Sequence, residues 1–293
     1  MTRKVIRWAA VCMLVLFALM AAAQEKEQYL DIEKVQVKPE KRAEFDALSK
    51  KMTEANRRNG GDTWLTMESL YGEGNVITFV SERSSFGDVE KGMNAFDSAM
   101  TKAYGADQAK KIEADWNACT SSIQSELRLR RWDLSSNIPK DAAGLAKMVG
   151  LSRYLRTTRV KVRPGRGDDF EASLKEVKEV REKSAPQNIM LVSQVVAGEE
   201  GTVYYISTLE PTMGDYDKLT LAKKFLSGDQ YQKLMKSNAE LVESGYTTIH
   251  HFLPEVSNAP EQVAAASPEF WTPKPVVAAK KSPANNAAKK EVK

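Results

Sequence analysis

The sequence predicts an α+β protein in which two diverged copies of one domain follow each other along the chain. Three observations predict this class: an internal repeat, the same order of strand and helix signals in both copies, and strands whose apolar residues do not alternate cleanly. The order strand, helix, strand, strand, helix, strand is typical of an antiparallel sheet with its helices on one face. The repeat decides the interpretation, because it divides the core into residues 24–133 and 152–256.

The repeat is clearest where a strand signal ends at a proline. Pro39 aligns with Pro164, which sets an offset of 125 residues, and Val37 and Val162 precede them. The offset changes only in turns, to 127 where Gly87 meets Gly214 and later to 122. Because loop length has little effect on stability, such changes are what duplicated domains accumulate. The same offset of 125 aligns six further pairs of identical residues: Tyr29/Tyr154, Leu30/Leu155, Val35/Val160, Phe45/Phe170, Ala47/Ala172 and Lys50/Lys175.

Each copy begins with a strand that ends at its proline, and an amphipathic helix follows. A hairpin, a helical region broken at Gly105 or Gly228, and a last strand complete the copy. Strand signals cover residues 29–37, 64–71, 76–82 and 123–132 in the first copy and 154–162, 189–196, 202–208 and 246–252 in the second. Helices on one face leave the other face of each sheet bare, and the poor alternation indicates that this face is also buried. We therefore expect the two sheets to cover each other.

This doubled order resembles the dimeric α/β-barrel superfamily, to which the antibiotic-biosynthesis monooxygenase-like domains belong. The resemblance rests on the element order and on a Val-x-Val-Lys/Arg-Pro pattern followed by Phe, at residues 35–45 and 160–170. It covers residues 28–256 and implies two ferredoxin-like split-βαβ units, packed sheet to sheet as an intrachain pseudo-dimeric α/β barrel. Residues 134–151 are the expected connector. Because the chain supplies both units, we expect a monomer.

The two ends of the chain predict export and an unfolded tail. Residues 1–23 have a basic start, an apolar run and a final Ala-Ala-Ala, which is typical of a signal peptide. The apolar run is shorter than the roughly 20 residues that span a bilayer, so no transmembrane segment is expected after cleavage. Residues 257–293 are rich in Ala, Pro and Lys and predict disorder, although Phe270 and Trp271 could dock on the barrel. The expected location is extracytoplasmic, periplasmic or secreted.

The charge distribution argues against a nucleic-acid partner. The whole chain carries +4, but residues 1–23 and 257–293 each carry +3, which leaves −2 for residues 24–256. Binding to nucleic acid needs a clustered basic face, which this core does not predict. Of two cysteines only Cys119 remains after signal cleavage, and its alignment with Leu241 predicts a buried, inert thiol.

Five aromatic residues are candidates for a pocket between helices and sheet: Trp64, Tyr71, Trp116, Tyr204 and Tyr205. Superfamily members that act without a cofactor use pocket aromatics, although packing in the core explains the same residues. Members that degrade haem use histidine with asparagine and tryptophan. Trp64, Trp116 and Asn117 are present here, but the first copy has no histidine, so no cofactor is expected.

The mature chain has two histidines, His250 and His251, next to each other on the last predicted strand. Neighbours on a strand point to opposite faces, so they cannot hold one metal together and no metal site is expected. His250 shares a face with Tyr246, and this pair is a catalytic candidate for proton transfer. The alternative is a strand end half exposed to water.

Three functions remain open from the sequence. The first is an exported barrel protein that binds a small apolar or aromatic ligand, without catalysis. The second is a cofactor-independent oxygenase-like enzyme of the same superfamily, with His250 and Tyr246 active. The third is a cell-envelope interaction module that acts through the C-terminal tail.

Overall fold

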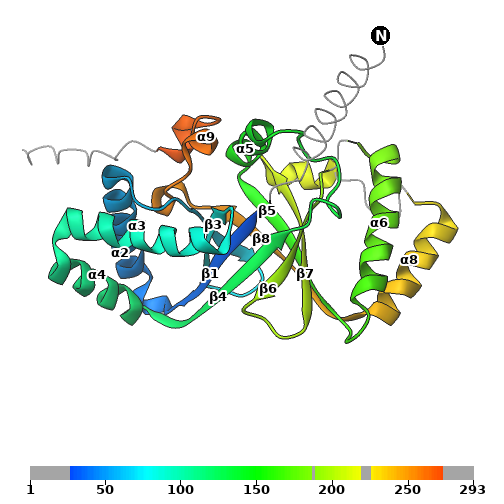
Figure 1. The fold of residues 1–293 in the computed structure, drawn as a ribbon, viewed down its shortest axis with the longest axis horizontal. Helices are drawn as coiled ribbons and strands as arrows, with labels where there is room; N and C mark the ends of the chain where they lie inside the picture. The colour runs from blue at the N-terminus through cyan, green and yellow to red at the C-terminus, as the bar shows by residue number, and fades with distance from the viewer. Residues whose placement is uncertain (1–26, 187–188, 219–225, 273–293) are drawn as a thin grey trace, which may run out of the picture.

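The computed structural model describes residues 27–186, 189–218 and 226–272, and its strands form one closed antiparallel barrel (Figure 1). The first half of the barrel consists of β1 (Tyr29–Val37), α2 (Arg42–Asn59), β2 (Leu65–Tyr71), β3 (Val76–Arg83), α3 (Phe86–Tyr104), α4 (Ala106–Ala118) and β4 (Thr120–Arg130). The second half consists of β5 (Tyr154–Val162), α6 (Gly167–Ser184), β6 (Leu191–Ala197), β7 (Thr202–Glu210), η2 (Met213–Lys218), α8 (Gly228–Leu241) and β8 (Val242–Phe252). A short helix, η1 (Pro39–Lys41), follows β1, and α5 (Ala142–Leu151) joins the halves.

The barrel closes because each half pairs with the other along two seams. Around the barrel the strands follow the order β1-β3-β2-β8-β5-β7-β6-β4. In each half the first strand is central, so β1 lies between β3 and β4, and β5 lies between β7 and β8. The seams are β2 with β8 and β4 with β6, both antiparallel. The sheets are therefore hydrogen-bonded at both edges, which leaves no edge strand exposed.

Helices cover the outside of the barrel on two opposite sides (Figure 1). Helices α2, α3 and α4 lie against the first half, where Val35, Ile77 and Phe45 belong to one buried apolar cluster. Helices α6 and α8 lie against the second half, where Val160, Phe170 and others form another cluster. Each strand thus has one face toward helices and one toward the barrel interior. This double burial explains why the apolar residues do not alternate cleanly along the strands.

One end of the barrel is closed by α5 together with the segment that follows β8. This segment contains η3 (Pro254–Val256), α9 (Glu261–Ala264) and α10 (Pro268–Trp271), and its helix α9 lies near α5 above the strands (Figure 1). Trp271 is 0 % exposed, and its Nε1 donates to the carbonyl oxygen of Gly150 at 2.8 Å. Helices α5 and α9 approach so closely that a Cβ on Gly150 would lie 2.3 Å from the carbonyl oxygen of Val263.

The prediction of a disordered tail over 257–293 is therefore wrong for residues 257–272. Val263 and Trp271 join Met67 and Phe252 in an apolar cluster at this end of the barrel. Their side chains supply enough apolar area to hold the segment in place, although its composition is dominated by Ala and Pro. Residues 273–293 lie outside the described residues, as do residues 1–23 of the expected signal peptide. Cys119 is buried, as predicted.

Candidate functional site

A cavity of about 370 Å³ lies between the helices and the sheet of the first half, where the sequence predicted a pocket. It lies on the outer face of β1 and β3 and under α2, α3 and α4. Its walls combine aromatic rings with carboxylates, of which Asp97 is exposed and Glu33 and Glu113 are half-buried. The lining residues that matter below are Asp31, Glu33, Asp62, Trp64, Phe79, Arg83, Phe96, Asp97, Glu113 and Trp116.

Two tryptophans of this cavity are held by hydrogen bonds from their indole nitrogens. Nε1 of Trp116 on α4 donates to Oγ of Ser49 on α2 at 2.9 Å. Nε1 of Trp64 donates to the carbonyl oxygen of Val256, in the segment after β8, at 2.8 Å. Phe96 lies 5.9 Å from Trp64, and Phe79 lies 6.1 Å from Trp116, measured between ring centroids. The rings are thus fixed in orientation, with both indoles satisfied and buried.

The cavity contains one arginine, Arg83, and two of the carboxylates neutralise it. Its Nη1 and Nη2 donate to the two carboxylate oxygens of Asp62 at 2.7 and 2.6 Å, a bidentate pair. Nη2 also donates to Oδ2 of Asp31 at 3.2 Å. Helix α3 can pass directly over the guanidinium because residue 92 is glycine, where a Cβ would lie 2.5 Å from Nη1. Asp62 and Asp31 therefore already neutralise the charge of Arg83, and its guanidinium is not available to bind an anionic ligand.

Three further carboxylates of the cavity, those of Glu33, Asp97 and Glu113, make no hydrogen bond or ion pair within the described residues. Burial and then the charge of Asp31 raise the pKa of Glu33. Burial and then Asp97 raise the pKa of Glu113. The charge of Lys110 acts in the opposite direction on the pKa of Glu113, so the negative charge of the cavity is partly compensated. In the part of the chain that the structure describes, no three His, Cys, Asp or Glu side chains converge as metal ligands would.

A second cavity, of about 150 Å³, lies inside the barrel and is lined by residues from every strand. On β1 the inward side chains are Leu30, Ile32 and Lys34, and their counterparts on β5 are Leu155, Thr157 and Arg159. Apolar residues gather at the end closed by α5, where Leu155 and Leu209 meet the cluster around Trp271. Lys34 and Arg159 lie toward the other end, where the cavity reaches the exposed ring of Tyr246.

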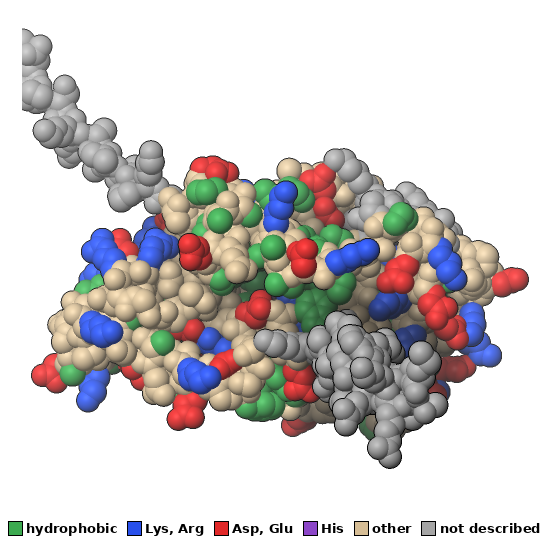
Figure 2. Space-filling view, turned by 45° about the horizontal axis from the view of Figure 1, so that its top comes forward, with side chains coloured by type: hydrophobic (Ala, Val, Ile, Leu, Met, Phe, Trp, Pro, Cys, Tyr) green, Lys and Arg blue, Asp and Glu red, His purple; other side chains and the backbone are tan. Residues whose placement is uncertain are grey.

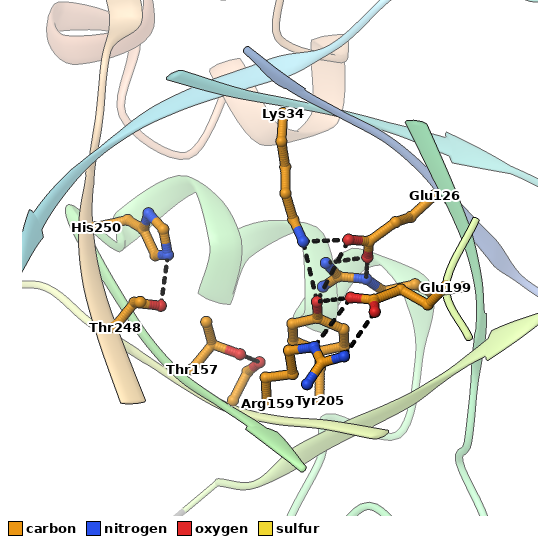
Figure 3. A network of polar contacts seen from close by, with 10 residues as sticks. Lys34, Glu126, Thr157, Arg159, Glu199, Tyr205, Thr248 and His250 are labelled. Atoms are coloured by element: carbon orange, nitrogen blue, oxygen red, sulfur yellow. Dashed lines mark hydrogen bonds and ion pairs between the residues drawn. The ribbon is translucent and has the colours of Figure 1, made fainter. Parts of the chain in front are cut away.

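Five charged residues of the barrel interior form one network around Tyr205: Lys34, Glu126, Arg128, Arg159 and Glu199 (Figure 3). Glu126 has no exposed side-chain surface and bonds Lys34, while Nε and Nη2 of Arg128 donate to its Oε2 at 2.9 and 2.6 Å. Lys34 Nζ also donates to the Tyr205 hydroxyl at 3.0 Å, and the Arg128 guanidinium lies 3.3 Å from the centre of the Tyr205 ring. Burial and then Arg128 lower the pKa of Lys34. The network continues from the Tyr205 hydroxyl to Glu199, which forms a bidentate pair with Arg159.

His250 and Tyr246 both face the barrel interior, but the structure does not bring them together. His250 is 8 % exposed, its Nε2 lies 2.9 Å from Oγ1 of Thr248, and its Nδ1 lies 3.3 Å from Oγ of Ser69. Tyr246 lies nearer the open end, with its ring 5.9 Å from the Arg159 guanidinium. His251 points to the outer face, 4.0 Å from Glu68, so adjacent histidines do face opposite ways. Burial, followed by the charges of Arg128 and Lys34, lowers the pKa of His250 to about 4.

The lowered pKa of His250 predicts a loss of stability in mild acid. The unfolded chain protonates a histidine near its ordinary pKa of 6.5, whereas the folded protein keeps His250 neutral down to about pH 4. As pH falls through this window, only the unfolded state takes up the proton. We expect about 2 kcal/mol of unfolding free energy to be lost between pH 7 and pH 5. Urea denaturation of His250→Gln should show a correspondingly weaker pH dependence, and His251→Gln should keep it. Equal pH dependence in the wild type and His250→Gln would contradict this assignment.

The predicted pocket aromatics are distributed over different environments. Trp64 and Trp116 line the helix–sheet cavity of the first half, and Tyr205 faces the barrel interior. Tyr204 is 1 % exposed and belongs to the core of the second half, where its hydroxyl donates to Glu171 at 2.6 Å. Tyr71 is 62 % exposed at the end of β2. The aromatics therefore do not form one pocket.

Sequence reasoning missed the interior charges, Lys34, Glu126, Arg128 and Arg159. One signal was available, because Lys34 and Arg159 occupy equivalent positions at the offset of 125. A second was the alternation of Glu126, Arg128 and Arg130, which places all three on one face of a strand. Such charges are usually solvated on a strand, and only closure of the barrel turns this face inward.

The first-half cavity does not fit haem. Haem iron takes a histidine, cysteine or tyrosine ligand in most proteins, or methionine together with histidine. None of the described residues lining this cavity is a histidine, cysteine or tyrosine. His250 is inside the barrel, where a cavity of about 150 Å³ is far smaller than a pocket for a large cofactor.

The surface shows no concentrated charge on the face drawn in Figure 2, where Lys and Arg side chains are interspersed with Asp and Glu. Among the described residues, no helix combines the length and apolar character that crossing a bilayer requires.

Comparison with known proteins gives structural likeness without sequence likeness. No protein-family model matches the sequence, and no curated protein matches it. A candidate monooxygenase from Lactobacillus acidophilus superposes with a TM-score of 0.47 at 12 % identity, over 77 % of this chain and 93 % of that one. A candidate monooxygenase from Fusobacterium nucleatum gives 0.49 at 10 % identity, over 78 % and 94 %. A chlorite dismutase from Candidatus Nitrospira defluvii gives 0.41 at 9 % identity, over 82 % and 94 %. With scores this low, the architecture described above rests on the strand pairings of this chain itself.

Proposed function

We propose that the protein binds a small organic cation with an apolar body in the helix–sheet cavity of its first half. The observation that carries this proposal is the combination of fixed aromatic rings with the unpaired carboxylates of Glu33, Asp97 and Glu113. The sequence predicted a small apolar or aromatic ligand. The carboxylates indicate that this ligand also carries a positive charge. Nothing in this cavity requires a chemical step.

The arrangement favours an organic cation over a metal ion or a neutral ligand. A metal ion needs several ligand atoms at one point, whereas these carboxylates are spread around the rings. A cation over an aromatic face gains about 2 kcal/mol or more when it is desolvated, most strongly with tryptophan. Burial and, after it, repulsion by Asp31 and Asp97 raise the pKa values of Glu33 and Glu113, and a bound positive charge would relieve that repulsion. A neutral ligand would leave that repulsion in place.

Titration calorimetry with benzyltrimethylammonium tests the proposal, with benzyl alcohol as a neutral aromatic control. We expect saturable binding of the cation and none of the alcohol. Substituting Glu33→Gln and Glu113→Gln together should weaken binding about a hundredfold, at about tenfold for each lost charge. Glu90→Gln, an exposed acid on α3 outside the cavity, is the matched control and should bind normally. Binding should weaken as pH falls, beginning above the ordinary glutamate pKa of 4.5, because only the ionised carboxyls attract the cation.

Two results would contradict the proposal: equal binding of benzyl alcohol, or undiminished binding by the double variant. The oxygenase-like alternative predicts something different, namely oxygen consumption with an aromatic substrate that is lost in His250→Ala. The envelope-module alternative predicts binding to cell-envelope material that is lost when residues 273–293 are removed. Neither outcome is expected from a binding protein whose site lies in the first half.

We further propose that the protein works outside the cytoplasm as a monomer, and that its halves are tandem ferredoxin-like copies produced by duplication. The repeat at offset 125 supports duplication, as do the equal element orders and the equal pairings around β1 and β5. The basic and apolar start of the chain supports export. N-terminal sequencing of the mature protein and light scattering in solution test these proposals, which predict a first residue of Gln24 and a monomeric mass.

A further inference from the structure

Arg130 is a half-buried arginine that lines the barrel interior and makes no ion pair with any described residue. It lines the interior cavity at the end of β4, and its Nε is shielded from solvent and has no hydrogen-bond partner. Its guanidinium lies 5.7 Å from the ring of Trp132, which offers no acceptor. Burial, which outweighs the opposing charge of Glu82, lowers its pKa to about 10. A charge placed this way is costly unless something pairs with it.

Unlike Arg130, the other cations of the barrel interior each have a carboxylate partner. Lys34 and Arg128 share Glu126, and Arg159 forms a bidentate pair with Glu199. These acids are already used by their own partners. Arg128, two residues away on the same face of β4, adds a second positive charge beside Arg130. Local charge thus favours an anion at Arg130, in contrast with the acidic helix–sheet cavity on the outer face of the first half.

The surroundings of Arg130 supply a hydrogen-bond donor and an apolar wall. Ser193 on β6 is the residue directly opposite Arg130 across the β4–β6 seam, and it also faces the cavity. Ser193 is 4 % exposed, and its hydroxyl makes no hydrogen bond within the described residues. Leu30 on β1 and Leu191 on β6, the strands on either side of β4, line the same cavity.

We propose that the barrel interior is a second binding site, in which Arg130 and Ser193 hold the carboxylate of a small apolar carboxylic acid. The planar fork of an arginine matches the two oxygens of a carboxylate, and the serine hydroxyl donates to one of them. Leucine side chains suit a short hydrocarbon chain better than a second charged group. The cavity of about 150 Å³ corresponds to the liquid volume of about five waters, which limits the ligand to a few non-hydrogen atoms.

The site has a route to solvent at the end of the barrel away from α5. The cavity extends to Tyr246 and Glu73, and the Tyr246 side chain is 49 % exposed. A ligand that enters there passes the network around Tyr205, in which three cations face two carboxylates and leave a net positive charge. The site is independent of the proposed cation site, because it differs in place, in charge and in residues.

Butyrate is a suitable probe, with butyramide as its neutral counterpart of the same shape and inorganic phosphate as an anion without a chain. We expect butyrate to raise the melting temperature of the full-length mature protein at constant ionic strength, and butyramide and phosphate to leave it unchanged. Arg130→Met should bind butyrate at least about tenfold more weakly, since it removes a charge-assisted pair of hydrogen bonds. Ser193→Ala should weaken binding by a smaller factor. Arg163→Met, at an exposed position, is the matched control and should behave as the wild type.

Arg130→Met is expected to fold, because replacing an unpaired, half-buried charge with an apolar side chain is often neutral or stabilising. Arg130→Lys is a second variant, which keeps the charge and loses the fork, and it should also bind more weakly. The proposal is overturned if Arg130→Met retains wild-type affinity, or if butyramide or phosphate binds as tightly as butyrate. Benzyltrimethylammonium binding should be unaffected by Arg130→Met, which separates failure of this site from failure of the cation site.

Discussion

Replacing Glu126 with glutamine is expected to destabilise the protein by about 3–5 kcal/mol, the usual cost of removing one partner from a buried ion pair. Glu126 is completely buried and is the shared partner of Lys34 and Arg128. Glutamine is neutral, so both cations would remain in the barrel interior without their counter-charge. The loss is measurable as a lower urea midpoint at unchanged slope.

The comparison variants distinguish the loss of charge balance from a loss of packing. Glu199→Gln removes a carboxylate from Arg159 at a more accessible place, where both side chains are 13 % exposed, and should be less damaging. Replacing Lys34, Glu126 and Arg128 together with Met, Leu and Met should restore much of the stability, because no charge is then left unpaired. If the triple variant were as unstable as Glu126→Gln, packing rather than charge would be the cause.

Trp271→Ala is expected to cost about 3–5 kcal/mol, the range for deleting a large aromatic side chain from a core. The indole is 0 % exposed, lies 5.5 Å from the ring of Phe252, and makes a hydrogen bond to Gly150. Its removal leaves a cavity and an unsatisfied carbonyl oxygen at the end of the barrel. Thermal and urea unfolding of the variant measure the effect.

The neighbouring Phe270 is the matched control for Trp271. Its ring is only partly buried and lies 3.8 Å from the Arg153 guanidinium, so Phe270→Ala should cost much less. We also expect Trp271→Ala to increase hydrogen exchange in α5, because the indole fastens the C-terminal segment to that helix. Unchanged stability of Trp271→Ala would show that the segment does not hold the barrel end closed.

The strands were the most predictable part of the fold. The predicted strands 29–37 and 154–162 coincide with β1 and β5, because in each a β-branched run is ended by a proline. The break at Gly105 separates α3 from α4, as expected from the helix pattern. Packing of one sheet against the other was also anticipated. The hydrogen-bonded seams were not, because the pairing of β2 with β8 joins residues about 180 positions apart and no local pattern encodes it.

The candidate sites were only partly predictable, and the reason differs from residue to residue. Trp64 and Trp116 line a cavity as expected, because a large aromatic ring on the inward face of a helix or strand is buried in the core or in a cavity beside it. Tyr204 and Tyr205 are neighbours in sequence, yet one fills the second core and the other faces the barrel, because strand neighbours alternate. In the sequence, Glu33 and Arg130 resemble ordinary solvated strand charges, and only the surrounding helices and strands make them half-buried.

The segment after β8 also affects how the protein can reach its folded state. The carbonyl oxygen of Val256 accepts hydrogen bonds from Thr53, Trp64 and Thr66, at 3.1, 2.8 and 2.8 Å. These three residues belong to the half that leaves the ribosome first, and their partner is synthesised about 200 residues later. An amino-terminal fragment that ends before Val256 would contain these three donors but not their acceptor. The indole of Trp64 would then lose the hydrogen bond that fixes it. The two halves should consequently melt in a single transition, and neither should persist when the other is cut away.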